Sequence, residues 1–326
     1  MAVYTPIDAS AMRELVARYD GPGAFVSYAP ILGGVTNTNF RVTCERGEAV
    51  LTVVEDGTSA KDAAFFARAM EAAAASNVPA PRPYPLISGG YVAEIYGKPA
   101  FLCAFLPGES PKRPGNAHLY ALGETLAAFH LGAAGITDDK ENLWNIQRCR
   151  AFFEERRRDV EKAYPRAASL LEEEFCYLAS HDFSFLPKGI VHGDVFPDNT
   201  LFEGTRLAGV IDFFYACRET LLYDLGVCLN AWCFEREDCA FNFTKASFFL
   251  RGYHAGRPLS VDEERYLPYF CRLTALRFLT SRLEAALRDS RQGALVAHRD
   301  PEEYCRRLAF HRSVKGDRPY AAISAA

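Results

Sequence analysis

The most constraining feature of this chain is a polar motif set between apolar segments in residues 190–213. A short apolar strand leads into His-Gly-Asp, whose aspartate is Asp194, and Asn199 stands five positions further on. A second apolar stretch turns at 203–205 and ends at Asp212. Turn residues between apolar runs predict a hairpin. The three polar side chains are therefore expected to come from loops and strand ends that share one site.

Two carboxylates and an amide in this arrangement are the groups that a phosphoryl-transfer site requires. One carboxylate must meet the attacking hydroxyl, and we expect Asp194 in that role. An amide oxygen and a second carboxylate hold Mg²⁺ against nucleotide phosphates, which suits Asn199 and Asp212. His192 is expected to hold the loop. The alternative is that these groups only satisfy backbone atoms of the loop, which the complete spacing disfavours.

The first third of the chain is predicted to form an antiparallel sheet with one helix. Residues 24–55 alternate apolar strands with turns, and residues 91–106 contain a further hairpin. Between them, Thr58 or Ser59 caps an alanine-rich helix that runs to about residue 76.

The rest of the chain is predicted to be mainly helical. Apolar residues repeat at helical spacing from Leu119 to Phe129. Residues 152–180 indicate two solvated helices, which Pro165 separates. Helix is also expected over 221–290, interrupted near 256–258, with Pro268 a candidate for a second break.

This order of elements predicts an α+β fold of two lobes. The N-lobe, with the sheet, is expected at 1–106 and the helical C-lobe at 107–326. Ligands favour clefts between such lobes.

A glycine-rich turn lies between the first two predicted strands. Backbone N–H groups of such a turn can cover phosphates, because glycine permits close approach. A plain hairpin turn is the alternative, and the position ahead of the polar motif favours a nucleotide-binding role. The candidate residues are Gly33, Gly34, Thr36, Asn37 and Thr38.

The motif resembles the protein-kinase-like superfamily, in which H-x-D-x-x-x-x-N is followed by an Asp-Phe pair. Gly193 replaces the arginine of ordinary protein kinases, and Ile-Asp-Phe-Phe at 211–214 replaces Asp-Phe-Gly. This form is similar to the aminoglycoside and choline kinase branch. The resemblance implies a kinase of small hydroxylated or amino-bearing molecules, not of proteins.

The resemblance also implies roles outside the motif. Phe105 and Leu106 fall in a segment that resembles the hinge whose backbone pairs with adenine; a buried strand without a ligand is the alternative. Asp224 matches an aspartate that braces the catalytic loop in this superfamily, and a simple helix cap would involve nearly the same chemistry.

One position departs from the pattern of most kinases of this fold. Where the third strand usually carries a phosphate-binding lysine, this chain has Thr52. Lys61 or Lys98 are candidates to supply the charge, with loop amides and magnesium as the alternative. For the same reason no glutamate is assigned as its partner, although Glu71 is available.

Several segments together resemble the homoserine kinases of this fold. They are 33–40, 50–52, 142–144, 211–217, 221–225 and 229–233. The resemblance covers nearly the whole chain, and that family also carries threonine in place of the lysine. It implies ATP-dependent phosphorylation of the side-chain hydroxyl of L-homoserine, on the way to threonine.

An amino acid acceptor needs a clamp for its carboxylate, and arginine is the better clamp. Arg277 and Arg282 are the candidates, and Tyr215, Asn230 and Trp232 are candidates to line the same pocket. Ordinary packing roles are the alternative for each of these residues. Two other functions stay open: a kinase of another hydroxylated amine, such as an aminoglycoside or choline, and a non-catalytic nucleotide-binding module.

Composition narrows the class of partner. The 326 residues carry a net charge of −4, which disfavours nucleic acid binding. No apolar run approaches the roughly 20 residues that span a bilayer, and the N-terminus lacks a secretory pattern. A small-molecule partner in the cytoplasm is expected. The ten cysteines are not spaced for zinc and are expected to be buried free thiols.

Overall fold

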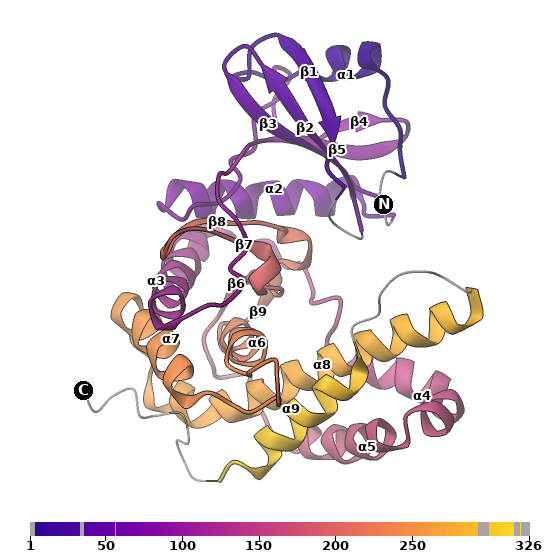
Figure 1. Ribbon diagram of the computed structural model, residues 1–326, viewed down its shortest axis with the longest axis vertical. Coiled ribbons are helices and arrows are strands. Elements are labelled where there is room, and N and C mark those ends of the chain that lie inside the picture. Colours follow the sequence, from indigo (N-terminus) through magenta and orange to yellow (C-terminus); the bar gives the residue numbers. More distant parts are fainter. Residues whose placement is uncertain (1–3, 33–35, 56, 293–299, 316–319, 321–326) are drawn as a thin grey trace.

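The computed structural model describes residues 4–32, 36–55, 57–292, 300–315 and 320, with side chains of the long helix up to 288. A sheet with two helices forms one lobe, and the remaining helices form the other (Figure 1). The elements of the sheet lobe are α1 (Ala9–Val16), β1 (Phe25–Pro30), β2 (Thr38–Cys44), β3 (Gly47–Val53), α2 (Ala60–Ala75), β4 (Ala93–Ile95) and β5 (Lys98–Ala104).

The N-lobe sheet is antiparallel, with strand order β1-β2-β3-β5-β4. Its two faces belong to different cores because side chains alternate along each strand. Leu51 and Leu102 belong to the core under α1, whereas Phe101 belongs to the larger core that includes α2 and the C-lobe. Thr52 pairs with Phe101, so Thr52 lies on the face toward α2 and the other lobe.

The C-lobe is built from seven helices and two short two-stranded sheets among the residues that the structure describes. Its helices are α3 (Asn116–Gly132), α4 (Ile146–Ala163), α5 (Pro165–Ala179), α6 (Leu222–Trp232), α7 (Phe243–Gly256), α8 (Val261–Gln292) and α9 (Pro301–Ser313). Its strands are β6 (Lys188–Val191), β7 (Thr200–Glu203), β8 (Arg206–Val210) and β9 (Cys217–Thr220), with β6 paired to β9 and β7 to β8.

Helices α3 and α7 cross closely because glycine faces backbone at the contact. A Cβ on Gly123 would lie 2.1 Å from the carbonyl oxygen of Phe249, and one on Gly252 would lie 2.1 Å from that of Tyr120. This crossing holds α3 beside the strands that carry the polar motif. Segment 105–115 connects β5 to α3, and we keep residue 106 as the proposed boundary between the lobes.

The sheet, α2 with its Ser59 cap, the hairpin β4-β5 and the break between α4 and α5 at Pro165 agree with the sequence analysis. Three expectations were incomplete. Pro268 does not interrupt α8, residues 233–242 separate α6 from α7, and α1 and α9 were not predicted. Within the described part of the chain, no helix is both long and apolar enough to cross a membrane.

Candidate active site

The loop that follows β6 is held from below by one buried carboxylate. Asp224, at the start of α6, accepts hydrogen bonds from the backbone N–H groups of His192 and Gly193, both at 2.7 Å. The same carboxylate lies 3.1 Å from Nε2 of His130 on α3. On the other side of this ring, Nδ1 of His130 lies 2.8 Å from the hydroxyl of Tyr253 on α7. Asp224 therefore makes the contacts that a brace for the loop requires.

His192 fixes the loop to the end of the β7-β8 hairpin. Its Nε2 donates to the carbonyl oxygen of Ile211 at 3.0 Å, and its Nδ1 accepts from the backbone N–H of Asp194 at 3.2 Å. Burial lowers the pKa of the His192 imidazole, which favours the neutral ring that these two bonds need. His192 thus positions Asp194 next to the residue that precedes Asp212.

Gly193 explains why this loop carries no arginine. Its φ is +78°, and a Cβ at this position would lie 2.7 Å from the carbonyl oxygen of Tyr215. A larger residue would need both an unfavourable backbone conformation and a displaced segment after Asp212. The close approach brings Tyr215 beside the loop.

Asp194 and Asn199 are in direct contact. Nδ2 of Asn199 donates to the backbone carbonyl of Asp194 at 2.8 Å and to its Oδ2 at 2.9 Å. Behind the loop, Nε1 of Trp232 donates to the carbonyl oxygen of Val195 at 2.8 Å. Trp232 is buried and supports the loop, and its role in the acceptor pocket stays a prediction.

Asp212 has the left-handed backbone conformation, with φ of 70° and ψ of 60°. Strained conformations of this kind concentrate at functional sites. Burial, reinforced by the negative charge of Asp194, raises the pKa of Asp212 to about 7. A cation beside Asp212 would reverse this effect.

The donor set at these residues fits magnesium. Because Nδ2 of Asn199 is used by Asp194, its Oδ1 faces no competing donor among the hydrogen bonds of the described residues. An amide oxygen and the carboxylate of Asp212 are the hard oxygen ligands that Mg²⁺ takes together with substrate phosphates. No group of three or more His, Cys, Asp or Glu side chains in the described ranges could hold a metal. A cation here would therefore need the phosphates as further ligands.

The glycine-rich turn is described only in part. Gly33 and Gly34 lie outside the described residues, and Thr36 is exposed. Oδ1 of Asn37 accepts from the backbone N–H of Glu55 at 3.2 Å, and Oγ1 of Thr38 donates to the Glu55 carboxylate at 2.6 Å. The side chains of Asn37 and Thr38 thus anchor the base of the turn.

Neither Lys61 nor Lys98 lies at the position on β3 where most kinases of this fold carry a lysine, which is the position of Thr52 in this chain. Oγ1 of Thr52 donates to Oδ1 of Asn39 at 2.7 Å on the face toward α2. Nζ of Lys98 donates to Glu55 and, at 2.7 Å, to Oγ1 of Thr5, near the α1 side of the sheet. Lys61 is exposed on the first turn of α2. Groups other than Lys61 and Lys98 would therefore have to supply positive charge at the nucleotide phosphates.

The predicted hinge follows β5 directly. The backbone N–H of Phe105 donates to the carbonyl oxygen of Glu48 at 3.1 Å, and the guanidinium carbon of Arg41 lies 4.5 Å from the Phe105 ring centroid. Leu106 lies against the β7-β8 hairpin, because a Cβ on Gly209 would lie 3.1 Å from its Cδ1. These two residues therefore connect the lobes.

Among the acceptor candidates, Arg277 and Tyr215 come together beside Asp194. Arg277 is 4% exposed on α8, and its Nη2 lies 3.9 Å from Oδ1 of Asp194. Its guanidinium carbon lies 5.0 Å from the ring centroid of Tyr215 and 5.6 Å from that of Trp144. Its Nε is buried and makes no hydrogen bond within the described part of the chain.

Asn230 and Arg282 make other contacts in the structure, and their roles in acceptor binding stay predictions. Nδ2 of Asn230 donates to the carbonyl oxygens of Gly226 and Cys271, which packs α6 on α8. Arg282 donates to the carbonyl oxygen of Asp300 at 2.9 Å and pairs with Glu303 on α9. Polar groups that are this buried in helix contacts commonly serve packing.

The sequence analysis missed two contributors. His130 lies in an apolar helix and gave no signal beyond being a lone histidine on a buried face. Trp144 belongs to a segment that resembled the homoserine kinases, but its place beside Arg277 depends on tertiary structure.

A two-lobed fold with these residues at the junction defines the small-molecule phosphotransferases of the protein-kinase-like fold. The family model described as "Phosphotransferase enzyme family" matches residues 27–259. An amicoumacin kinase solved in complex with AMP-PNP, Ca²⁺ and Ami has the same fold, with a TM-score of 0.68 at 15% identity over 94% of this chain and 92% of that chain.

Curated relatives narrow the family. Homoserine kinase of Azorhizobium caulinodans is 39% identical over 98% of this chain and 99% of its own length. Homoserine kinase of Rhodopseudomonas palustris is 40% identical over 98% of this chain and 97% of its own length. The chain belongs to the homoserine kinase family of these phosphotransferases.

Proposed function

We propose that this chain transfers the γ-phosphoryl group of ATP to the side-chain hydroxyl of L-homoserine, giving O-phospho-L-homoserine for threonine biosynthesis. The reaction needs only small molecules, and the proposal places it in the cytoplasm, where ATP and free amino acids are available. Magnesium is the proposed cofactor.

The observation that carries the acceptor assignment is Arg277. A buried guanidinium 3.9 Å from the catalytic aspartate would repel a choline or an aminoglycoside, which carry positive charge. It would attract a carboxylate, for which its planar fork is the best-matched side chain. An acceptor with a carboxylate close to its hydroxyl satisfies Arg277 and Asp194 at once.

The proposed roles follow from the geometry. Asp194 orients the acceptor hydroxyl and accepts its proton as the bond from that oxygen to the γ-phosphorus forms. The bond from the γ-phosphorus to the β,γ-bridging oxygen of ATP breaks in the same reaction, and ADP leaves. Asn199 and Asp212 would hold Mg²⁺, which supplies the positive charge that neutralises the triphosphate. The brace through Asp224 and His192 keeps Asp194 in place before the acceptor arrives, so that most of the rate enhancement comes from positioning.

The test compares L-homoserine with 3-aminopropan-1-ol, which is the same acceptor without its carboxylate. Wild-type protein is expected to prefer homoserine by a factor of about 30 to 1,000 in kcat/KM, because a charge-assisted pair is lost. Arg277→Met should lose most of this preference by lowering kcat/KM for homoserine. Arg306→Met, an exposed arginine on α9, is the matched control and should keep it.

Two results would overturn the assignment. If wild type used both acceptors equally, no carboxylate clamp would exist. If Arg277→Met remained folded and kept the preference, the clamp would lie elsewhere and the role of Arg277 would be structural.

A further inference from the structure

The two phenylalanines that follow Asp212 pack into different parts of the molecule. Phe213 is buried beside the catalytic loop, and its ring centroid lies 4.6 Å from that of His192. Phe214 is partly buried and packs against the core that includes α2 and the C-lobe. The sequence pattern assigned no role to either ring.

The Phe214 ring lies between two rings of the N-lobe. Its centroid lies 5.6 Å from that of Phe66 on α2, in an edge-to-face arrangement, and 5.9 Å from that of Phe101 on β5, in a stacked one. Aromatic pairs at such distances contribute more than the area they bury. Phe66 and Phe101 are buried, so neither ring can move aside without a change in the packed core around it. One side chain of the C-lobe thus contacts both the helix and the sheet of the N-lobe.

Helix α2 is attached to the C-lobe by an ion pair. Nζ of Lys140, in the segment before α4, lies 2.9 Å from Oδ1 of Asp62 on α2 and 5.4 Å from the ring centroid of Phe66. Figure 1 shows α2 between the sheet and the C-lobe. Of the two partners of Phe214, Phe66 is therefore tied to the C-lobe, whereas Phe101 belongs to the sheet.

Phe101 lies beside the strand position where most kinases of this fold carry a lysine. It pairs with Thr52 across β3 and β5, and directly opposite residues of paired strands have neighbouring side chains on one face. In protein kinases, an ion pair between that lysine and a helix glutamate must be in place for activity. Thr52 cannot form this pair, and its Oγ1 donates to Asn39 instead. The contact of Phe101 and Phe66 with Phe214 joins sheet, helix and metal segment by apolar packing.

The backbone of Asp212 needs support from its neighbours. Its left-handed conformation, with φ of 70°, is unfavourable for a residue other than glycine. Asp212 precedes a 3₁₀ turn, Phe213–Tyr215, so the placement of the Phe214 ring constrains this turn. Burial raises the pKa of Asp212, and the backbone N–H of Phe214 acts in the opposite direction, so this N–H lies toward the carboxylate. A shift of Phe214 would therefore change both the backbone of Asp212 and the surroundings of its carboxylate.

We propose that Phe214 is a positioning residue for the metal site: held between Phe66 and Phe101, it keeps Asp212 in the conformation that binds Mg²⁺. Through Phe101, the N-lobe sheet acts on this site in place of the ion pair that Thr52 cannot make. The inference rests on the proposed function, because it takes Asp212 as a ligand of Mg²⁺.

Binding of ADP with and without magnesium tests this role without turnover. Isothermal titration calorimetry gives the Kd of ADP in EDTA and in saturating Mg²⁺, and the first constant divided by the second is the magnesium ratio. The ratio should be at least about ten in wild type, because Mg²⁺ takes ligands from both the protein and the phosphates. Asp212→Asn removes the carboxylate ligand and should abolish most of this ratio.

Two substitutions at Phe214 separate the ring from its apolar character. Phe214→Leu keeps an apolar side chain but loses the ring that reaches both partners, so it should lower the magnesium ratio at least about fivefold. Its Kd for ADP in EDTA should stay within about twofold of wild type, because no metal is positioned there. Phe214→Tyr keeps the ring and should restore the ratio to within about twofold of wild type.

Phe101→Leu tests whether the sheet acts through Phe214. It should lower the magnesium ratio about threefold or more by itself and have no further effect in combination with Phe214→Leu, which a double-mutant cycle measures. Phe101→Leu also provides the test of the contact if Phe214→Leu does not fold.

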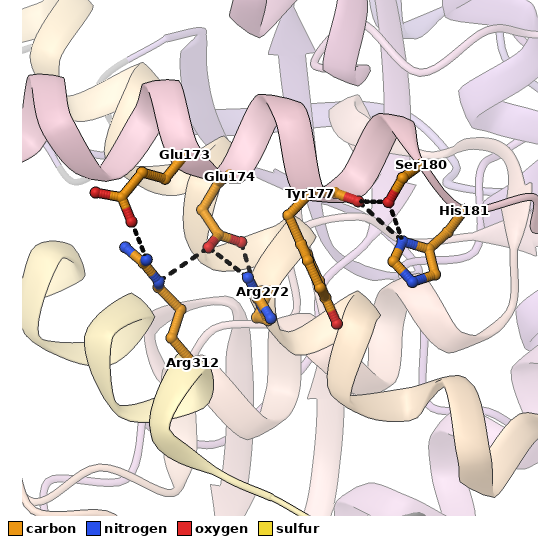
Figure 2. Close-up of polar contacts among 7 residues, drawn as sticks. All are labelled: Glu173, Glu174, Tyr177, Ser180, His181, Arg272 and Arg312. Carbon is orange, nitrogen blue, oxygen red and sulfur yellow. Dashed lines mark hydrogen bonds and ion pairs between the residues drawn. The ribbon is translucent and has the colours of Figure 1, made fainter.

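The matched control removes an aromatic stack of the C-lobe. Tyr177 on α5 stacks on Tyr269 with 5.6 Å between ring centroids. It lies beside Arg272, whose Nε donates to Glu174 at 2.8 Å (Figure 2). Figure 1 shows α5 at the end of the C-lobe away from α2. Tyr177→Leu should therefore lower the free energy of unfolding, as Phe214→Leu does, but leave the magnesium ratio at its wild-type value.

The variants distinguish this proposal from the proposed function. A ratio that falls in Asp212→Asn but keeps its wild-type value in folded Phe214→Leu would overturn the positioning role alone. A ratio that survives in Asp212→Asn would overturn the metal assignment, and the positioning role with it. Equal losses in Phe214→Leu and Tyr177→Leu would show a general loss of stability instead of positioning.

The action of the sheet has its own contradicting results. Additive losses in the double variant would show that Phe101 does not act through Phe214. An equal rise of both Kd values in Phe101→Leu would show that Phe101 supports nucleotide binding without any effect on the metal site.

Discussion

The catalytic loop belongs to the C-lobe and the base of the glycine-rich turn belongs to the N-lobe, and the protein holds the two by different means. Asp224, His192 and His130 are buried, and their hydrogen bonds fix the catalytic loop from three sides. At the base of the glycine-rich turn the Glu55 side chain is buried as well, but its ion-pair partner Lys98 is 37% exposed. Buried polar networks are costly to disturb, whereas exposed pairs contribute little.

This difference indicates which groups each lobe contributes to the proposed function. In the proposed mechanism the C-lobe presents the reacting groups in a fixed arrangement, so its residues should be intolerant of change. The N-lobe carries Thr52 in place of a lysine, and its contribution to phosphate binding should depend on backbone groups that side-chain changes barely affect. The following experiments, from the largest expected effect to the smallest, test this contrast.

Asp194→Asn should lower kcat by a factor of about 10² to 10⁴ with little change in KM, because the group that accepts the hydroxyl proton is lost. Steady-state kinetics with L-homoserine and ATP measure both constants. Asp139→Asn, an exposed aspartate in the segment before α4, is the control. A kcat within threefold of wild type would remove Asp194 from its role.

Asp224→Asn should lower the free energy of unfolding by about 3 kcal/mol. The carboxylate accepts two backbone N–H groups and faces His130, and hydrogen bonds to a charged group are each worth about 1.5 to 3 kcal/mol. Urea unfolding gives the value. Asp182→Asn, where the aspartate bonds to Ser184 at the surface, should lower the free energy of unfolding far less. Equal losses in the two variants would contradict the contrast between buried and exposed contacts.

Asp212→Asn should make the metal-free protein more stable than wild type in a pH-dependent way. The pKa of Asp212 rises from 3.8 to about 7 on folding, so folded wild type resists ionisation. The loss of folding free energy that Asp212 causes in wild type is absent below pH 3.8, grows as the pH rises to about 7, and is then constant.

The stability difference between this variant and wild type, from denaturant unfolding at pH 4 to 8, gives the direct check. It should widen across that interval, and Mg²⁺ with nucleotide should stabilise wild type alone. A difference independent of pH would show that Asp212 is ionised in the folded protein throughout.

Lys98→Met should raise the KM for ATP by less than about fivefold and leave kcat unchanged. The lysine is 37% exposed and pairs with Glu55 near the α1 side of the sheet, so its loss loosens the turn without removing a phosphate ligand. Lys61→Met serves as the comparison and should match wild type. A loss of a hundredfold or more in either variant would identify the missing phosphate-binding cation.

The sequence predicted the parts of the fold that depend on local pattern. Alternating strands, the Ser59 cap and Pro165 each act within a few residues, and each lies where expected. Pro268 was harder to place, because contacts of neighbouring α8 residues such as Cys271 with Asn230 outweigh the hydrogen bond that a proline removes. Tertiary packing therefore keeps α8 continuous through Pro268.

The candidate site also divides into residues that the sequence pattern predicts and residues that only tertiary structure brings together. Asp194, Asn199 and Asp212 could be proposed from the sequence because their spacing along the chain matches a motif of the protein-kinase-like superfamily. The convergence of Trp144, Tyr215 and Arg277 could not, because these residues come from three distant segments that meet only in the folded protein. The roles of Asn230 and Arg282 stay predictions, because a polar side chain on a helix has the same sequence pattern whether it packs against another helix or binds a ligand.

The measurement that tests the account most directly is ADP release by the purified protein with Mg-ATP and L-homoserine, L-serine, choline or an aminoglycoside as acceptor. The account predicts turnover on L-homoserine with a kcat/KM at least about a hundredfold above choline and the aminoglycoside, as expected for a site that pairs a carboxylate with Arg277. Its kcat/KM should also exceed that for L-serine by about tenfold or more, because the serine hydroxyl is one methylene closer to the carboxylate. Preference for choline or the aminoglycoside would contradict the acceptor assignment while keeping the kinase. Nucleotide binding without turnover on any of the four would contradict the catalytic account itself.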